Sequence, residues 1–170
     1  TLYFDRVRFA YFDMCILKRT GAADDYPAEL IDRVWDLDKT ISEAEKEALV
    51  DTIIVKTQGF INGNIKEGDQ NPVAIFKRLL QQYDGINKDR LRENMKYFLE
   101  RIMPVCDQYD INMCVHPDDP PAAVLGLPRI VTGAEDMEWI IQAVDTPHNG
   151  ITFCAGSLSS GAHNDVPALA

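Results

Sequence analysis

The second half of the chain alternates between helical and strand-like hydrophobic patterns, and this alternation limits the possible folds more than any other feature. Hydrophobic residues over 91–105 recur at spacings of three and four, which is typical of an amphipathic helix. Strict alternation over 111–116 predicts a strand. A second helix over 137–144 and a short strand over 151–154 follow. The order helix–strand–helix–strand predicts an α/β fold with a parallel sheet.

The first half has a different pattern, which places a boundary near residue 86. We expect residues 1–86 to form a strand or loop followed by a lid-like helical insertion, and residues 87–170 to form βα units. The run 7–17 is so hydrophobic that it fits either a strand or a buried helix. Residues 59–64 predict a turn-rich loop. The expected helix starts are Pro27, Ser42 with Glu45 three residues later, and Asn71 before Pro72.

Two residues with metal-binding chemistry follow the predicted strands. His116 ends the first strand and Cys154 ends the second. Neighbouring parallel strands bring their carboxyl ends to one edge of a sheet, so the two side chains can converge there. An imidazole and a thiolate suit zinc, iron(II) or manganese(II). Two ligands are too few for a catalytic site, and the alternative is a hydrogen-bonded histidine and a packed cysteine.

Residues near these strand ends are candidates for substrate binding. Asp118 and Asp119 follow His116 and fit metal or substrate ligands, or simply a turn. The guanidinium of Arg129 matches a carboxylate group, although a surface salt bridge is an equal alternative. Ser157 lies in the segment just after Cys154 and is a further candidate for contact with substrate.

Composition excludes several classes of partner. The formal net charge is −10, which disfavours nucleic acids and anionic membranes. No hydrophobic run approaches the roughly 20 residues of a membrane helix. The four cysteines are irregularly spaced, which favours reduced thiols and a cytoplasmic location over a disulfide scaffold.

Several stretches resemble the mannonate dehydratase family. The most specific is Val-His-Pro-Asp-Asp-Pro-Pro over 115–121, combined with the later Asn-Gly-Ile-Thr-Phe-Cys-Ala-Gly-Ser over 149–157. Further matches are Leu-Arg-Glu-Asn over 91–94, Leu-Gly-Leu-Pro-Arg-Ile over 125–130, and Glu-Asp-Met-Glu-Trp over 135–139. The resemblance covers most of the chain, including the residues 9–19 and 24–26 of the helical insertion.

The resemblance implies a fold, a reaction and a metal. The family fold is a (β/α)₈ TIM barrel, and the enzymes dehydrate D-mannonate to 2-keto-3-deoxy-D-gluconate in glucuronate catabolism. The metal, Mn²⁺ or Fe²⁺, is held by two histidines, one cysteine and one aspartate. His116 and Cys154 match the first two ligands in chain order. The resemblance also implies a small sugar acid as substrate. We expect a homo-oligomer, because the open strand edges and hydrophobic helix faces of a partial barrel favour association.

The chain differs from this family pattern in its extent. A complete barrel needs about 250 residues, whereas the second half predicts only two barrel strands. The sequence also begins at Thr1 without a methionine. We therefore expect a middle portion of the enzyme, inactive by itself, with the other metal ligands and the acid–base groups elsewhere. The alternatives are another metal-dependent sugar isomerase or epimerase, and a non-catalytic helical interaction module.

Overall fold

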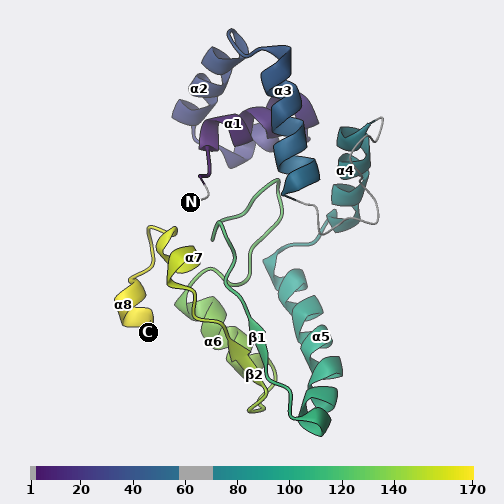
Figure 1. Ribbon diagram of the computed structural model, residues 1–170, viewed down its shortest axis with the longest axis vertical. Helices are drawn as coiled ribbons and strands as arrows, with labels where there is room; N and C mark the ends of the chain where they lie inside the picture. The colour runs from purple at the N-terminus through teal and green to yellow at the C-terminus, as the bar shows by residue number, and fades with distance from the viewer. Residues whose placement is uncertain (1–2, 58–70) are drawn as a thin grey trace. The chain divides into compact units, whose positions relative to one another are not determined.

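The structure is a computed structural model that describes residues 3–57 and 71–170 (Figure 1). The chain divides into two compact units, Thr1–Asp84 and Gly85–Ala170. The loop expected over 59–64 lies outside the described residues.

The described part of the first unit is helical. Its elements are α1 (Arg6–Tyr11), the π-helix η1 (Phe12–Leu17), the 3₁₀ turn η2 (Ala22–Asp25), α2 (Ala28–Asp38), α3 (Glu43–Val50), the π-helix η3 (Asp51–Lys56), α4 (Pro72–Leu80) and the 3₁₀ turn η5 (Gln81–Tyr83). Of the two alternatives for 7–17, the buried helix is confirmed and the strand is wrong. The core that joins α1 to α2 contains Ala10, Tyr11, Leu30, Val34 and Ile41.

The predicted helix starts of this unit are confirmed at two of three positions. The hydroxyl of Ser42 accepts the amide N–H of Glu45, and the Glu45 carboxylate accepts the Ser42 N–H, which completes a capping box. At α4, Oδ1 of Asn71 accepts the amide N–H of Ala74 and caps the helix, with Pro72 in its first turn. Pro27 is the cap of α2 rather than its first residue, so the helix begins one residue later than expected.

The second unit contains a parallel pair of strands between helices. Its elements are α5 (Lys88–Tyr109), β1 (Met113–Val115), α6 (Ala134–Ala143), β2 (Asn149–Ile151), α7 (Ala155–Ser159) and α8 (Val166–Leu169). Met113 pairs with Asn149 and Val115 pairs with Ile151. The α/β class is therefore confirmed. Within 3–57 and 71–170 the sheet has these two strands, which is not a closed barrel.

Helices cover one face of this pair of strands. Met113 packs against the cluster that Leu99, Met103 and Cys106 of α5 form. Val115 and Ile151 pack against a second cluster, which includes Ile140 of α6. Cys114 points from the middle of β1 in the opposite direction and is exposed. Helices α5 and α6 thus cover the same face of the two strands, which is the arrangement that a βα barrel repeats.

Three details of this unit differ from the sequence expectations. Strand β2 covers Asn149–Ile151, so it begins and ends earlier than the predicted 151–154. The most buried residues of α5 are Leu99, Met103 and Cys106, whereas Phe98 and Val105 of the predicted stripe are exposed. Thr132 and Glu135 have the three-residue spacing of a capping box, which predicts a helix start there, but α6 follows Gly133 and no side chain caps it.

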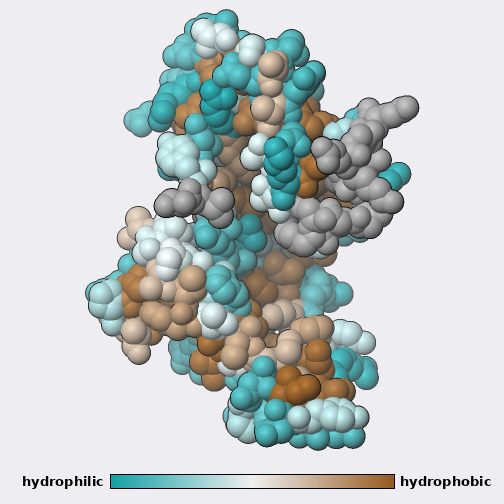
Figure 2. Space-filling model, in the orientation of Figure 1, coloured by the Kyte–Doolittle hydropathy of each residue, from teal (hydrophilic) through white to brown (hydrophobic). Residues whose placement is uncertain are grey.

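Parts of the second unit leave hydrophobic surface in contact with solvent. Figure 2 shows brown patches over this unit between hydrophilic regions. The exposed hydrophobic residues on α5 and just after it are Tyr97, Phe98, Val105, Tyr109 and Ile111. In the part of the chain that the structure describes, no helix is both long and hydrophobic enough to span a membrane.

Candidate metal centre

The sheet brings His116 and Cys154 to the same edge. His116 follows β1 directly, and Cys154 lies three residues beyond the end of β2. The Thr152 N–H donates to the Val115 carbonyl at 2.9 Å, so the two segments stay together past the last paired residues. The convergence of the two side chains at the carboxyl end of the parallel strands is thus present in the structure.

The ring of His116 is oriented by its neighbouring residue. Its Nδ1 lies 2.8 Å from the carbonyl oxygen of Pro117, and this contact requires a proton on Nδ1. The Pro117 carbonyl, together with a hydrogen bond to Cys154, raises the pKa of His116. When the ring is neutral, Nε2 therefore carries the free electron pair. A backbone acceptor on one ring nitrogen is the usual partner of a metal-binding histidine.

The thiol of Cys154 is held by the first turn of α7. The Ser157 hydroxyl lies 3.3 Å from Cys154 Sγ and donates to it. Hydrogen bonds from the hydroxyl and the backbone N–H of Ser157, with a further contribution from His116, lower the pKa of Cys154 to about 7. A large share of this cysteine is therefore a thiolate near neutral pH, and the thiolate is the form that binds metals.

These two donors fit part of a metal shell. A neutral imidazole nitrogen and a thiolate suit iron, manganese or zinc better than magnesium. Within the described residues, no group of three or more histidine, cysteine or acidic side chains is placed to hold an ion. His116 and Cys154 therefore fit such a metal as two of its ligands, and a full shell needs further donors.

The loop after His116 places the candidate substrate ligands in different environments. Asp119 is exposed, and its negative charge is among the smaller contributions that raise the pKa of His116. Asp118 turns inward, where its carboxylate accepts the N–H groups of Ile130 and Val131 and one nitrogen of Arg129. Arg129 is thus in a salt bridge, and its side chain keeps 30% of its surface exposed.

Ser157 has a role that sequence analysis missed. Its side chain is buried, with 4% of the residue exposed, and its hydroxyl is occupied by the Cys154 sulfur. The serine therefore lies behind the thiol rather than on an open surface. A signal was available, because Ser157 is three residues after Cys154, which is the spacing of a helix cap and its partner.

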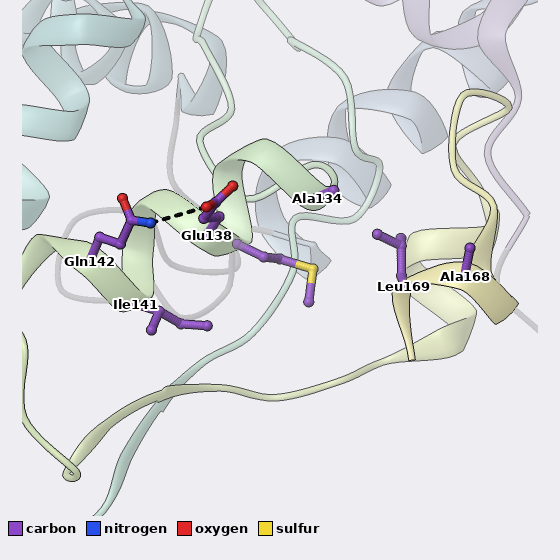
Figure 3. A pocket seen from close by; sticks show the side chains of 7 residues that line it. Ala134, Glu138, Ile141, Gln142, Ala168 and Leu169 are labelled. Atoms are coloured by element: carbon purple, nitrogen blue, oxygen red, sulfur yellow. Dashed lines mark hydrogen bonds between the residues drawn. The ribbon is translucent and has the colours of Figure 1, made fainter.

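A hollow of about 350 Å³ lies beside α6 and α8 (Figure 3). It is lined mostly by hydrophobic side chains, among them Met137, Ile141 and Leu169. Its carboxylate, Glu138, accepts a hydrogen bond from Gln142 on the next turn of the same helix. Neither His116 nor Cys154 lines this hollow, so the hollow is not part of the candidate metal centre.

Comparisons with known proteins agree on one family. The family model described as D-mannonate dehydratase matches residues 1–170. A mannonate dehydratase of a Marinomonas species is 39% identical over 165 residues, which are 97% of this chain and 40% of that protein. The enzyme of Chromohalobacter salexigens is 37% identical over 168 residues, which are 99% of this chain and 41% of that protein.

A solved structure is similar as well. The crystal structure of mannonate dehydratase from Streptococcus suis serotype 2 matches with a TM-score of 0.53 and 38% sequence identity. The match covers 62% of this chain and 29% of that one. The chain spans about two fifths of the length of the curated relatives above.

Proposed function

This chain belongs to the D-mannonate dehydratase family, and we propose that it forms part of an enzyme that removes water from D-mannonate. The product is 2-keto-3-deoxy-D-gluconate. The reaction takes a proton from C2, which is next to the carboxylate, and a hydroxyl group from C3. The resulting enol then becomes the ketone at C2.

The proposed metal ligands in this chain are Nε2 of His116 and Sγ of Cys154. The cofactor is Mn²⁺ or Fe²⁺, which when bound supplies positive charge that stabilises the anion developing at C2. The contact between Nδ1 of His116 and the Pro117 carbonyl keeps Nε2 available. The hydrogen bonds from Ser157 lower the pKa of Cys154 and so favour the thiolate form of its sulfur. The remaining ligands and the acid–base groups lie outside these residues.

We assign substrate contacts to the exposed part of the loop. The Arg129 side chain is 30% exposed, and a guanidinium suits the carboxylate of a sugar acid. Asp119 lies near His116 and can accept hydrogen bonds from sugar hydroxyls. Ser157 acts through Cys154 in this proposal, because its burial leaves its hydroxyl no room for a substrate.

The proposed setting follows the family. A complete (β/α)₈ barrel would use β1 and β2 as two of its strands, with the His116 end of the sheet at its catalytic face. The enzyme would act in glucuronate catabolism in the cytoplasm and would be a homo-oligomer.

The observation that carries this proposal is the convergence of His116 and Cys154 at one end of two paired parallel strands. The test is an assay of the full-length enzyme, loaded with Mn²⁺ or Fe²⁺, for formation of a 2-keto-3-deoxy acid from D-mannonate. We expect turnover by the wild type and a loss of at least about a hundredfold in His116→Ala and Cys154→Ala.

Two matched variants control for nonspecific damage. Cys114→Ala removes an exposed thiol on β1, and His163→Ala removes an exposed imidazole from the loop after α7. Both should retain nearly full activity. A wild-type enzyme that leaves D-mannonate unchanged would refute the proposed reaction. Full activity in Cys154→Ala would refute the proposed role of the thiolate.

A further inference from the structure

Asp118 makes two kinds of contact with its two carboxylate oxygens. Oδ2 accepts the backbone N–H of Ile130 at 3.1 Å and that of Val131 at 2.9 Å. Oδ1 accepts Nη1 of Arg129 at 3.2 Å. Oδ2 therefore binds the backbone at the end of the loop, and Oδ1 binds the guanidinium of Arg129.

The backbone adds a further constraint at this place. The Asp118 N–H donates to the Val131 carbonyl at 2.9 Å, so residues 118 and 131 are linked in both directions. Ile130 and Val131 are buried in the core under β1 and β2. The loop between them and His116 is thereby anchored close to the candidate metal centre, and Arg129 sits at the anchored end.

Arg129 keeps unused donors after this pairing. The salt bridge with Asp118 engages one nitrogen, Nη1, in a single contact rather than a bidentate one. Nε is buried and has no hydrogen-bond partner in the structure. A guanidinium has five N–H donors, of which Asp118 engages one, so a second carboxylate can still bind at the remaining Nη donors rather than at the buried Nε.

We propose that Asp118 is a positioning residue that holds Arg129 in place for the carboxylate of the substrate. This inference rests on the proposed function, because it assigns the substrate carboxylate to Arg129. Without the negative charge at Oδ1, the long arginine side chain would sample several rotamers, and binding would have to fix one of them. Asp118 therefore acts on substrate affinity and leaves the chemical step to other groups.

One substitution separates the two kinds of contact that Asp118 makes. In Asp118→Asn the amide oxygen can still accept the N–H groups of Ile130 and Val131. The amide nitrogen then faces Arg129, where it cannot accept a hydrogen bond. Asp118→Ala removes both kinds of contact. Glu93→Gln is the matched control, since it removes a carboxylate from an exposed pair with Arg90 in the same unit.

The experiment measures KM and kcat for D-mannonate, binding of D-mannonate by calorimetry, and Tm in the full-length, metal-loaded enzyme. We expect Asp118→Asn and Arg129→Ala each to raise KM and the dissociation constant by about tenfold, with kcat within about threefold of the wild type. The double variant should be no worse than the poorer single variant, because both changes remove one interaction. Glu93→Gln should leave every quantity unchanged, and Asp118→Asn should keep the wild-type Tm.

The possible failures are distinguishable. If the wild-type enzyme neither binds nor turns over D-mannonate, the proposed function and this inference are both overturned. Normal wild-type turnover with an unchanged KM in Asp118→Asn would overturn this inference alone. The same holds if the effects of Asp118→Asn and Arg129→Ala multiply in the double variant. A lower Tm in Asp118→Ala with wild-type KM in Asp118→Asn would show that the aspartate only stabilises the fold of the loop and does not position Arg129.

Discussion

At the scale of single residues, the hydroxyl of Ser157 is a support for the Cys154 sulfur. It donates to Sγ at 3.3 Å from a buried position, which fixes the direction of the thiolate. We expect Ser157→Ala in the full-length enzyme to weaken metal affinity by about tenfold, as losses of such supporting contacts do. Competition with a chelator measures this. Ser159→Ala is the control, since its exposed hydroxyl donates to the Gly156 carbonyl, and an equal loss there would contradict the role of Ser157.

Asp136 is a second residue at this scale, and its surroundings determine the pKa of its carboxyl group. Its buried carboxylate accepts the backbone N–H and the hydroxyl of Thr132 and pairs with Arg92 and Lys88. Burial by itself would raise the pKa of Asp136, but hydrogen bonds from Lys88, Thr132 and Arg92 outweigh it and lower the pKa to about 2.

This low pKa predicts a dependence of stability on pH. A carboxylate with a lower pKa in the folded state stabilises it above the unfolded value near 3.8, and this stabilisation disappears as the pH falls toward 2. We expect Asp136 to contribute about 2 kcal/mol between these limits. Urea unfolding should show the difference between wild type and Asp136→Asn shrinking from pH 5 to pH 2. A constant difference would contradict the assignment, and Glu138→Gln on the same helix is the control.

At the scale of elements, one asparagine joins the start of α6 to the end of α7. Asn164 Nδ2 donates to the carbonyls of Thr132 at 2.9 Å and Leu158 at 3.0 Å. A Cβ at Gly133 would lie 2.7 Å from Asn164 Oδ1, so a side chain there must push the asparagine out of its hydrogen bonds.

We therefore expect Gly133→Ala to lower the free energy of unfolding by about 1–3 kcal/mol. Gly156→Ala is the matched control, because a Cβ there would meet only Cys154 Sγ at 3.9 Å and the residue lies in a helix. Alanine should be neutral or stabilising at that position. Chemical denaturation compares the two variants, and equal stability of both would refute the contact with Asn164.

Helix starts were more predictable than helix faces or strand ends. The cap of α3 depends on two side chains three residues apart, so the sequence contains everything that the contact needs. At α6 the residues Thr132 and Glu135 have the same spacing, but no capping box forms. The backbone N–H and the hydroxyl of Thr132 both donate to the Asp136 carboxylate instead. Lys88 and Arg92 of α5 hold that carboxylate in place through ion pairs. Contacts between distant elements decided that case, and a local pattern does not contain them.

At the scale of the whole molecule, the exposed hydrophobic side chains of α5 are expected to cause association in solution. Tyr97, Phe98, Val105 and Tyr109 are each more than two fifths exposed. Hydrophobic surface of this kind favours association. We expect the 170-residue chain by itself to self-associate with rising concentration in sedimentation velocity, and Val105→Glu with Tyr109→Glu to reduce this. Glu100→Gln is the control, and a monomer at every concentration would contradict the expectation.

The fold class and the pairing of the two strands could be predicted from the alternation of patterns along 91–154. The edge where His116 and Cys154 meet followed from the rule for parallel strands, which needs only the order of elements. The inward turn of Asp118 and the burial of Ser157 could not be predicted, because they depend on how residues 130–131 and α7 return to the sheet.

The central claim is that His116 and Cys154 share one metal ion, and elemental analysis of the full-length native protein tests it most directly. We predict stoichiometric manganese or iron in the wild type and in Cys114→Ala, and its loss in both His116→Ala and Cys154→Ala, with circular dichroism showing all four proteins folded. Full metal content in both ligand variants would contradict the claim. Absence of metal from the folded wild type would also contradict it and would favour a non-catalytic interaction module.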